Sequence, residues 1–142
     1  MDATNGKNEQ IYKKGIQRDL KKAYIGFNVA KILENDKIVT GSWGCGIFGG
    51  NKLVKFLQQI LVANLLDLSL DYSCAKVDFS NSQDADYLIK IIEMLKIIKS
   101  NQIKTDQIYK ILMNLDNVLE SNIDVDKYIM DSIRKKNDNI MT

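Results

Sequence analysis

Apolar residues recur at helical spacing in the segment that follows residue 50. Starting at Leu53, they fall at i, i+3, i+4, i+7, i+8 and i+12, which marks one face of a helix. Asn51 stands where an N-cap is expected, and the series ends near Leu66. The pattern therefore predicts a core helix over about residues 51–66. Its inner face consists of Leu53, Phe56, Leu57, Ile60, Leu61 and Leu65.

The C-terminal half of the chain shows the same helical periodicity. It predicts helices over Ser82–Ser100 and Thr105–Leu119, with Ser82 and Thr105 as caps, and a last helix over Asp124–Lys136. The expected inner residues are Leu88, Ile91, Ile92, Leu95 and Ile98 in the first, and Ile108, Ile111, Leu112, Leu115 and Leu119 in the second. Asp84 and Asp86 fall in a first helical turn, where the helix dipole favours acidic side chains, so they are interpreted as helix-start charges rather than catalysts.

The N-terminal half mixes short helical and strand-like segments. Gln10–Leu20 is predicted as a short helix, and Ala23–Phe27 as a strand because of its Tyr, Ile and Phe. Asn28–Asp36 fits either a helical turn or a loop. Further strands are predicted at Ile38–Thr40 and within Leu70–Phe79. Strands alternating with helices indicate the α/β class.

The stretch Thr40–Gly50 reads T-G-S-W-G-C-G-I-F-G-G and holds five of the eight glycines. Clustered glycines indicate a backbone that adopts positive φ or approaches another group closely. A predicted strand precedes the stretch and the predicted core helix follows it. Free backbone N–H groups at such a turn, together with the helix dipole, favour an anion.

Three interpretations of this stretch follow from the pattern alone. Gly44–Gly49 matches the dinucleotide fingerprint G-x-G-x-x-G, but three residues, Gly41 to Trp43, separate it from the strand, and neither Asp67 nor Asp71 clearly ends a second strand. A Walker loop is excluded because no G-K-[ST] follows. The third interpretation is a glycine-rich turn that only lets a strand and a helix pack.

Two motifs in order resemble the poly(ADP-ribose) glycohydrolase family. Lys22–Phe27 reads K-A-Y-I-G-F, where the family has K-A-Y-x-G-F, and the glycine-rich stretch is similar to the family's T-G-N-W-G-C-G-A-F-G-G-D. Weaker similarity extends from Ile16 to about Glu120. The resemblance implies a macrodomain-like fold in one partial catalytic domain over residues 1–142, with the loop wrapped around the diphosphate of ADP-ribose.

The resemblance also implies a set of ligand contacts. Phe48 packs near ADP-ribose in the family, although it could instead fix the loop to the core, and Phe79 matches an aromatic that contacts adenine. Ser42 and Asn51 stand where the family usually has Asn and Asp, and Trp43 is interpreted as structural. The implied ADP-ribose contacts are Gly41, Ser42, Gly44, Cys45, Gly46, Ile47, Phe48, Gly49 and Phe79.

The catalytic motif of the family has no counterpart in this sequence. Glycoside hydrolysis needs carboxylates at the scissile bond, which the family supplies from three glycines followed by Gln-Glu-Glu. The glutamates here are Glu9, Glu34, Glu93 and Glu120, none adjacent to another and none after a glycine triplet. No catalytic residue is therefore assigned. The chain is expected to be either a piece of a glycohydrolase that needs the N-terminal half as a partner, or a non-catalytic module that binds ADP-ribose or its polymer.

The composition argues against several other kinds of partner and site. The net charge is +2 with no clustered basic run, so no direct recognition of DNA sequence is expected. The absence of histidine and the presence of only two cysteines argue against a metal site, and no cofactor is expected. Cys45 has no base to activate it as a nucleophile. No run is long enough to span a membrane, no leader is apparent, and the expected location is nuclear or cytoplasmic.

Overall fold

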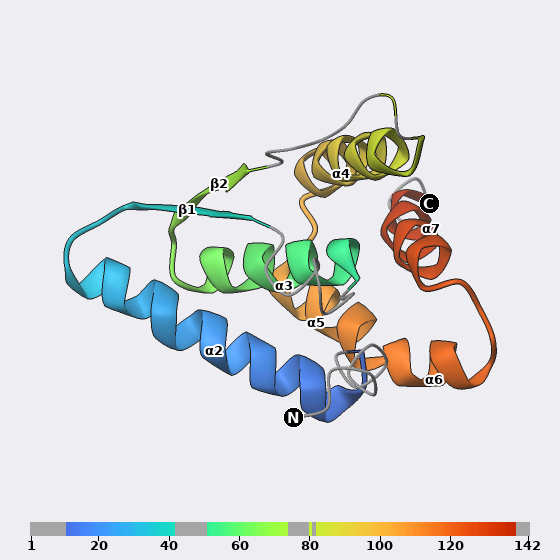
Figure 1. The fold of residues 1–142 in the computed structure, drawn as a ribbon, viewed down its shortest axis with the longest axis horizontal. Coiled ribbons are helices and arrows are strands. Elements are labelled where there is room, and N and C mark those ends of the chain that lie inside the picture. Colours follow the sequence, from blue (N-terminus) through green and yellow to red (C-terminus); the bar gives the residue numbers. More distant parts are fainter. Residues whose placement is uncertain (1–10, 42–50, 74–79, 81, 139–142) are drawn as a thin grey trace. The chain divides into compact units, whose positions relative to one another are not determined.

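The computed structural model describes residues 11–41, 51–73, 80 and 82–138, and among them the side chains of 83, 84 and 136–138 are left out (Figure 1). The chain divides into two compact units, Met1–Ala75 and Lys76–Thr142. Each is described by itself below.

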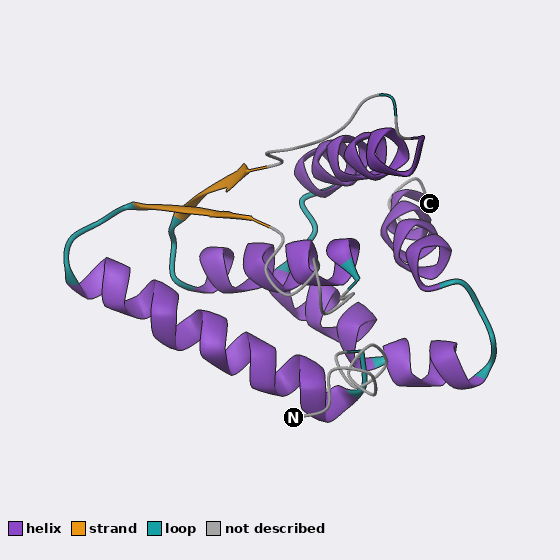
Figure 2. Ribbon diagram, in the orientation of Figure 1, coloured by secondary structure: helices purple, strands orange, loops and turns teal. Residues whose placement is uncertain are grey.

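The first unit is built on a β-strand–helix–β-strand motif (Figure 2). Helix α2 (Lys13–Ile32) leads into strand β1 (Lys37–Gly41), and helix α3 (Lys52–Leu65) connects β1 to strand β2 (Ser69–Ser73). The strands are parallel and in register from Lys37 opposite Ser69 to Gly41 opposite Ser73. Parallel neighbours need such a crossover, and here α3 supplies it.

The two strands have one half-buried face and one solvent-exposed face. Ile38, Thr40, Leu70 and Tyr72 are half-buried, and the Tyr72 ring meets the Phe56 ring of α3 edge-on, with centroids 4.8 Å apart. On the other face Lys37 Nζ lies 2.7 Å from a carboxylate oxygen of Asp71. This hydrogen bond and the charge of Asp71 raise the pKa of Lys37.

The strand predicted at Ala23–Phe27 is wrong, because these residues lie inside α2. Their aromatic and β-branched side chains favour a strand locally. The spacing of buried residues over the longer segment favours a helix instead. Ile16, Asp19, Ala23 and Phe27 are buried at intervals of three and four, the period of a helix. The helix predicted over Gln10–Leu20 is present and continues to Ile32, and positive φ at Glu34 then turns the chain toward β1.

The core helix after residue 50 is confirmed as α3, and so is its N-cap. The Asn51 side chain accepts a hydrogen bond of 3.0 Å from the Val54 amide. Leu65 was expected to point inward but is 57% exposed. The helix is buried around almost its whole circumference, including three polar residues, Lys55, Gln58 and Gln59. Its apolar stripe therefore marks only part of the buried surface.

The second unit is helical in the part that the structure describes. Its elements are α4 (Ser82–Ser100), α5 (Thr105–Met113), α6 (Leu115–Glu120) and α7 (Val125–Asp138). The bounds predicted for α4 are confirmed. Its inner face is rotated from the expected one, since Ile91 and Met94 are buried while Ile92 and Leu95 are nearly half exposed.

The single helix predicted over Thr105–Leu119 is two helices that meet at Asn114. The Asn114 side chain donates to the Tyr128 hydroxyl at 2.9 Å and accepts from the Asn117 side chain at 2.8 Å. Such polar side-chain bonds compete with the helical ladder, which explains the break. The N-cap of α5 is Lys104 rather than Thr105. No helix within the described residues has the length and apolar character needed to cross a membrane.

Candidate ligand-binding site

Most of the predicted contacts fall outside the described residues. These are Ser42, Gly44, Cys45, Gly46, Ile47, Phe48, Gly49 and Phe79. Gly41, at the end of β1, is the predicted contact that the structure describes, and Asn51 begins the structure again at the start of α3. The structure therefore describes the residues that flank this segment, Gly41 and Asn51.

The β1 end of the segment is fixed by a side chain of α3. Gln59 Nε2 donates a hydrogen bond of 2.9 Å to the backbone oxygen of Gly41. Gln59 is fully buried, which strengthens this bond by excluding water. Because Asn51 caps the same helix, both ends of segment 42–50 are attached to α3 within about two turns of each other.

Strand β2 lies close to Gly41. A Cβ atom there would come within 3.3 Å of the backbone oxygen of Ser73, the residue paired with Gly41 in the sheet. This distance is short for a carbon beside a backbone atom that cannot move freely. The glycine thus lets Gly41 and Ser73 stay paired at the ends of the two strands.

We expect Gly41→Ala to lower the free energy of unfolding by about 1–3 kcal/mol, the usual cost of overpacking. Gly26→Ala is the matched control, since a Cβ at this helical position would meet nothing within 4 Å. That control is expected to gain about 0.5–1 kcal/mol from helix propensity. Urea unfolding of the two variants measures both, and equal effects would contradict the close approach at Gly41.

A buried ion pair joins α2 to the first turn of α3. Lys55 Nζ bonds Asp19 Oδ2, and the side chains are only 3% and 8% exposed. Arg18 Nε also lies 3.1 Å from the other carboxylate oxygen of Asp19. The pair lies one turn after the Asn51 cap and connects α2 to the N-terminal part of α3. The sequence analysis missed it.

Two neighbouring buried amides on α3 differ in their bonding. Both polar atoms of the Gln58 side chain, and Oε1 of Gln59, have no hydrogen-bond partner among the described residues. An unsatisfied buried polar atom costs about 1–3 kcal/mol. The signal that could have located this polar group was the i, i+3, i+4 spacing of Lys55, Gln58 and Gln59 within an apolar helix.

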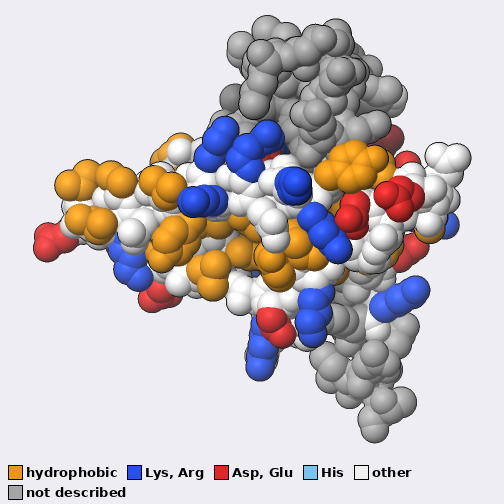
Figure 3. Space-filling model, turned by 90° about the horizontal axis from the view of Figure 1, so that it is seen from below, with side chains coloured by type: hydrophobic (Ala, Val, Ile, Leu, Met, Phe, Trp, Pro, Cys, Tyr) orange, Lys and Arg blue, Asp and Glu red, His pale blue; other side chains and the backbone are white. Residues whose placement is uncertain are grey.

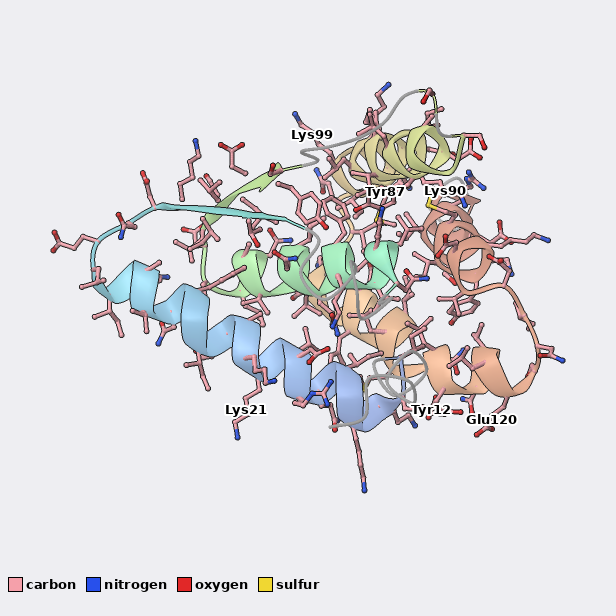
Figure 4. The ribbon with its side chains drawn as sticks, viewed as in Figure 1. Tyr12, Lys21, Tyr87, Lys90, Lys99 and Glu120 are labelled. Carbon is pink, nitrogen blue, oxygen red and sulfur yellow. The ribbon has the colours of Figure 1, made fainter. Side chains whose placement is uncertain are left out.

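The described glutamates lie in three different parts of the chain. Glu34 is exposed in the turn after α2, and Glu120 is exposed at the end of α6 (Figure 4). Glu93 accepts hydrogen bonds from Arg134, which connects α4 to α7 beside a pocket of about 240 Å³ that is lined mainly by charged residues. Within the described ranges no three His, Cys, Asp or Glu side chains gather as metal ligands.

A parallel strand pair whose crossover helix is preceded by a glycine-rich segment is the anion-binding arrangement of many α/β proteins. Residues 1–82 match the family model of the C-terminal catalytic region of poly(ADP-ribose) glycohydrolase, which is described as a macro domain fold. The chain therefore belongs to the poly(ADP-ribose) glycohydrolase family, and the expected α/β, macrodomain-like fold class is confirmed.

Two curated relatives agree with this assignment. Poly(ADP-ribose) glycohydrolase 2 of Caenorhabditis elegans is 30% identical over 128 residues, covering 89% of this chain and 24% of the relative. Poly(ADP-ribose) glycohydrolase 1 of the same organism is 42% identical over 89 residues, covering 62% of this chain and 11% of the relative. The chain thus spans a quarter or less of the length of either relative.

Proposed function

We propose that this chain binds ADP-ribose, free or as a unit of poly(ADP-ribose), through the segment that joins β1 to α3. The observation that carries the proposal is the attachment of both ends of that segment to α3, by the Gln59–Gly41 hydrogen bond and the Asn51 cap. Backbone N–H groups held at a helix N-terminus suit a diphosphate. The family assignment supports ADP-ribose as the bearer of that diphosphate.

The proposed role of the chain in hydrolysis is to hold the substrate. Hydrolysis of a ribose–ribose bond needs a carboxylic acid to protonate the leaving oxygen and assistance for the attacking water. The four glutamates of this chain are far apart in the sequence. Two of them, Glu93 and Glu120, lie in helices α4 and α6 of the second unit. The acid would therefore come from other sequence, in the same polypeptide or in a partner.

A non-catalytic ADP-ribose-binding module is the second candidate function. The absence of paired glutamates in the sequence favours it. The two functions differ in one result: restored hydrolysis when the N-terminal catalytic portion is supplied supports the first, and binding that never leads to hydrolysis supports the second.

The test is calorimetric titration of the 142-residue chain with ADP-ribose, with NADH as competitor, and an assay for ADP-ribose release from the polymer. Binding of ADP-ribose without turnover by the chain alone is expected. Preference for NADH would point to a dinucleotide site of the Rossmann type. Turnover by the chain alone would show that an acid is present that the sequence analysis did not recognise.

Phe48→Ala is expected to weaken ADP-ribose binding by about tenfold, since loss of an aromatic contact costs on the order of 1–3 kcal/mol. Calorimetry at a temperature where both proteins are folded gives the affinity. Trp43→Phe is a control that keeps an aromatic at the position interpreted as structural. An unchanged affinity of Phe48→Ala would assign Phe48 to packing of the loop instead.

A further inference from the structure

The N-terminal half of helix α2 concentrates the positive charge of the chain. Residues 13–22 hold five cationic side chains and one carboxylate, a net charge of +4, whereas the whole chain carries +2. The rest of the chain is therefore negative, with a net charge of −2. The cations are spread over ten positions rather than forming one basic run. They are Lys13, Lys14, Arg18, Lys21 and Lys22.

The helix brings three of these cations to one side. Lys14, Arg18 and Lys21 follow one another at intervals of four and three residues, which is the spacing of one helix face. All three are exposed and lie opposite the buried side of α2, and Figure 4 shows Lys21 directed away from α3. In Figure 3 Lys and Arg side chains gather over α2, beyond the hydrophobic side chains at the end that leads to β1. We call these three residues the basic face.

The carboxylate of this segment does not neutralise the basic face. Asp19 is buried, and its carboxylate is bound by Lys55 of α3 as well as by Arg18 Nε. One negative charge thus serves two positive ones. Among the described residues Lys14 and Lys21 form no ion pair.

Helices α2 and α3 run parallel, so the basic face lies at the end where α3 begins (Figure 1). Asp19 meets Lys55 near the starts of the two helices. Lys31 Nζ donates a hydrogen bond of 2.6 Å to the backbone oxygen of Leu66 at their ends. The Asn51 cap lies one turn before Lys55.

The other carboxylates described in the first unit lie toward the far end of α2. The first of them in sequence is thirteen residues after Lys21, about 20 Å at the rise of a helix. Exposed charges further apart than about 8 Å are largely screened at physiological ionic strength. These carboxylates are Glu34, Asp36, Asp67 and Asp71, and the last is paired with Lys37.

The cations of the basic face do not help α2 to fold. The first turn of the helix has no acidic residue, and Tyr12 provides no side-chain cap. Lysines at the positive end of the helix dipole disfavour the helix, and so do like charges four residues apart, such as Lys14 and Arg18. A bound anion would relieve both effects, which points to a polyanionic ligand.

We propose that the basic face binds the phosphates of a neighbouring unit of poly(ADP-ribose), so that this chain takes the polymer in preference to free ADP-ribose. The inference rests on the proposed function, which puts one diphosphate at the start of α3. Two ribose rings separate successive diphosphates of the polymer, and the basic face is one helix width from α3, about 10–12 Å. A polymer crossing the N-terminal half of α2 therefore brings its next diphosphate to Lys14, Arg18 and Lys21.

The test is titration of the 142-residue chain with ADP-ribose and, separately, with poly(ADP-ribose) of a narrow length range, at several salt concentrations. The double variant Lys14→Gln with Lys21→Gln is expected to weaken polymer binding by about tenfold at low salt. The slope of log K against log salt is expected to become shallower by about 1–2, because each lost phosphate contact reduces it. The affinity for ADP-ribose is expected to stay unchanged.

The double variant Lys96→Gln with Lys99→Gln is the matched control, since it removes the same charge from exposed positions of α4. Thermal unfolding by circular dichroism is expected to show no loss of stability in the α2 variant, which loses like-charge neighbours. Unchanged polymer binding by the α2 variant, or an equal loss in the control, would overturn the inference. Single-stranded DNA of equal charge that competes as well as the polymer would also overturn it.

The two titrations separate this inference from the proposed function. ADP-ribose binding reports on the proposed function alone, and the effect of the α2 variant on the polymer reports on the basic face alone. Polymer binding that depends on Lys14 and Lys21, without any binding of ADP-ribose, would overturn the proposed function and keep the basic face as a polymer-binding surface. ADP-ribose binding with a polymer affinity that ignores both lysines would do the reverse.

Discussion

Asp19→Leu is expected to lower the free energy of unfolding by about 3–5 kcal/mol, because it leaves the buried Lys55 ammonium without its carboxylate. The pair links α2 to the first turn of α3, and both side chains are almost completely excluded from water. Lys55→Met should have an effect of the same sign, since it leaves the carboxylate of Asp19 with only the partly exposed Arg18. Urea unfolding of the full chain, followed by circular dichroism, measures both changes in the free energy of unfolding.

The double variant Asp19→Leu with Lys55→Met separates the worth of the pair from the cost of breaking it. Apolar side chains of similar volume often replace a buried ion pair at little cost or with a gain. We therefore expect the double variant to be more stable than either single variant. Additive losses would show instead that the pair is net stabilising. A surface pair, Lys37–Asp71, provides a control, since exposed pairs contribute only about 0–1 kcal/mol.

The second large effect is expected at Gln59, whose side chain donates a hydrogen bond to the backbone oxygen of Gly41. Gln59→Leu removes the donor and leaves the Gly41 oxygen without it. We expect ADP-ribose affinity to fall by about tenfold or more, because a misplaced binding segment must be ordered at the expense of binding energy. Calorimetric titration at a temperature where the variant is fully folded measures the affinity.

Gln58→Leu is the matched control, since the two glutamines are adjacent and equally buried. The amide of Gln58 has no partner among the described residues, so replacing it removes unsatisfied atoms. We expect Gln58→Leu to raise stability by about 1–3 kcal/mol and to leave ADP-ribose affinity unchanged. Equal losses of affinity in the two variants would show that any apolar change in this helix disturbs binding, and that the Gly41 contact has no special part in it.

Local signals located the elements that surround the site. Strand β1 was predicted at Ile38–Thr40, where the glycine-rich stretch begins, and α3 from a stripe that continues for more than three turns. The Asn51 cap followed from its position alone, and the structure confirms its hydrogen bond to Val54. The ligand contacts within residues 42–50 and at Phe79 stay predictions, because they lie outside the described residues.

The errors occurred where neighbours in space outweighed neighbours in sequence. Ala23–Phe27 contains strand-favouring side chains, yet its burial against the core follows the helical period of α2. The break at Asn114 depends on a hydroxyl, that of Tyr128, which is contributed by a different helix. A period read along the chain gives no information about such a partner.

The sequence by itself determined the class of the fold, the family, and the place of the glycine-rich segment between a strand and a helix, because those depend on residue type and spacing along one stretch of chain. Only the tertiary structure decided which polar residues are buried and what they hold. Asp19 and Lys55 are 36 residues apart, and Gly41 and Gln59 are 18 apart. Whether such side chains meet depends on how α2 and β1 pack on α3, since water must be excluded before these bonds become strong.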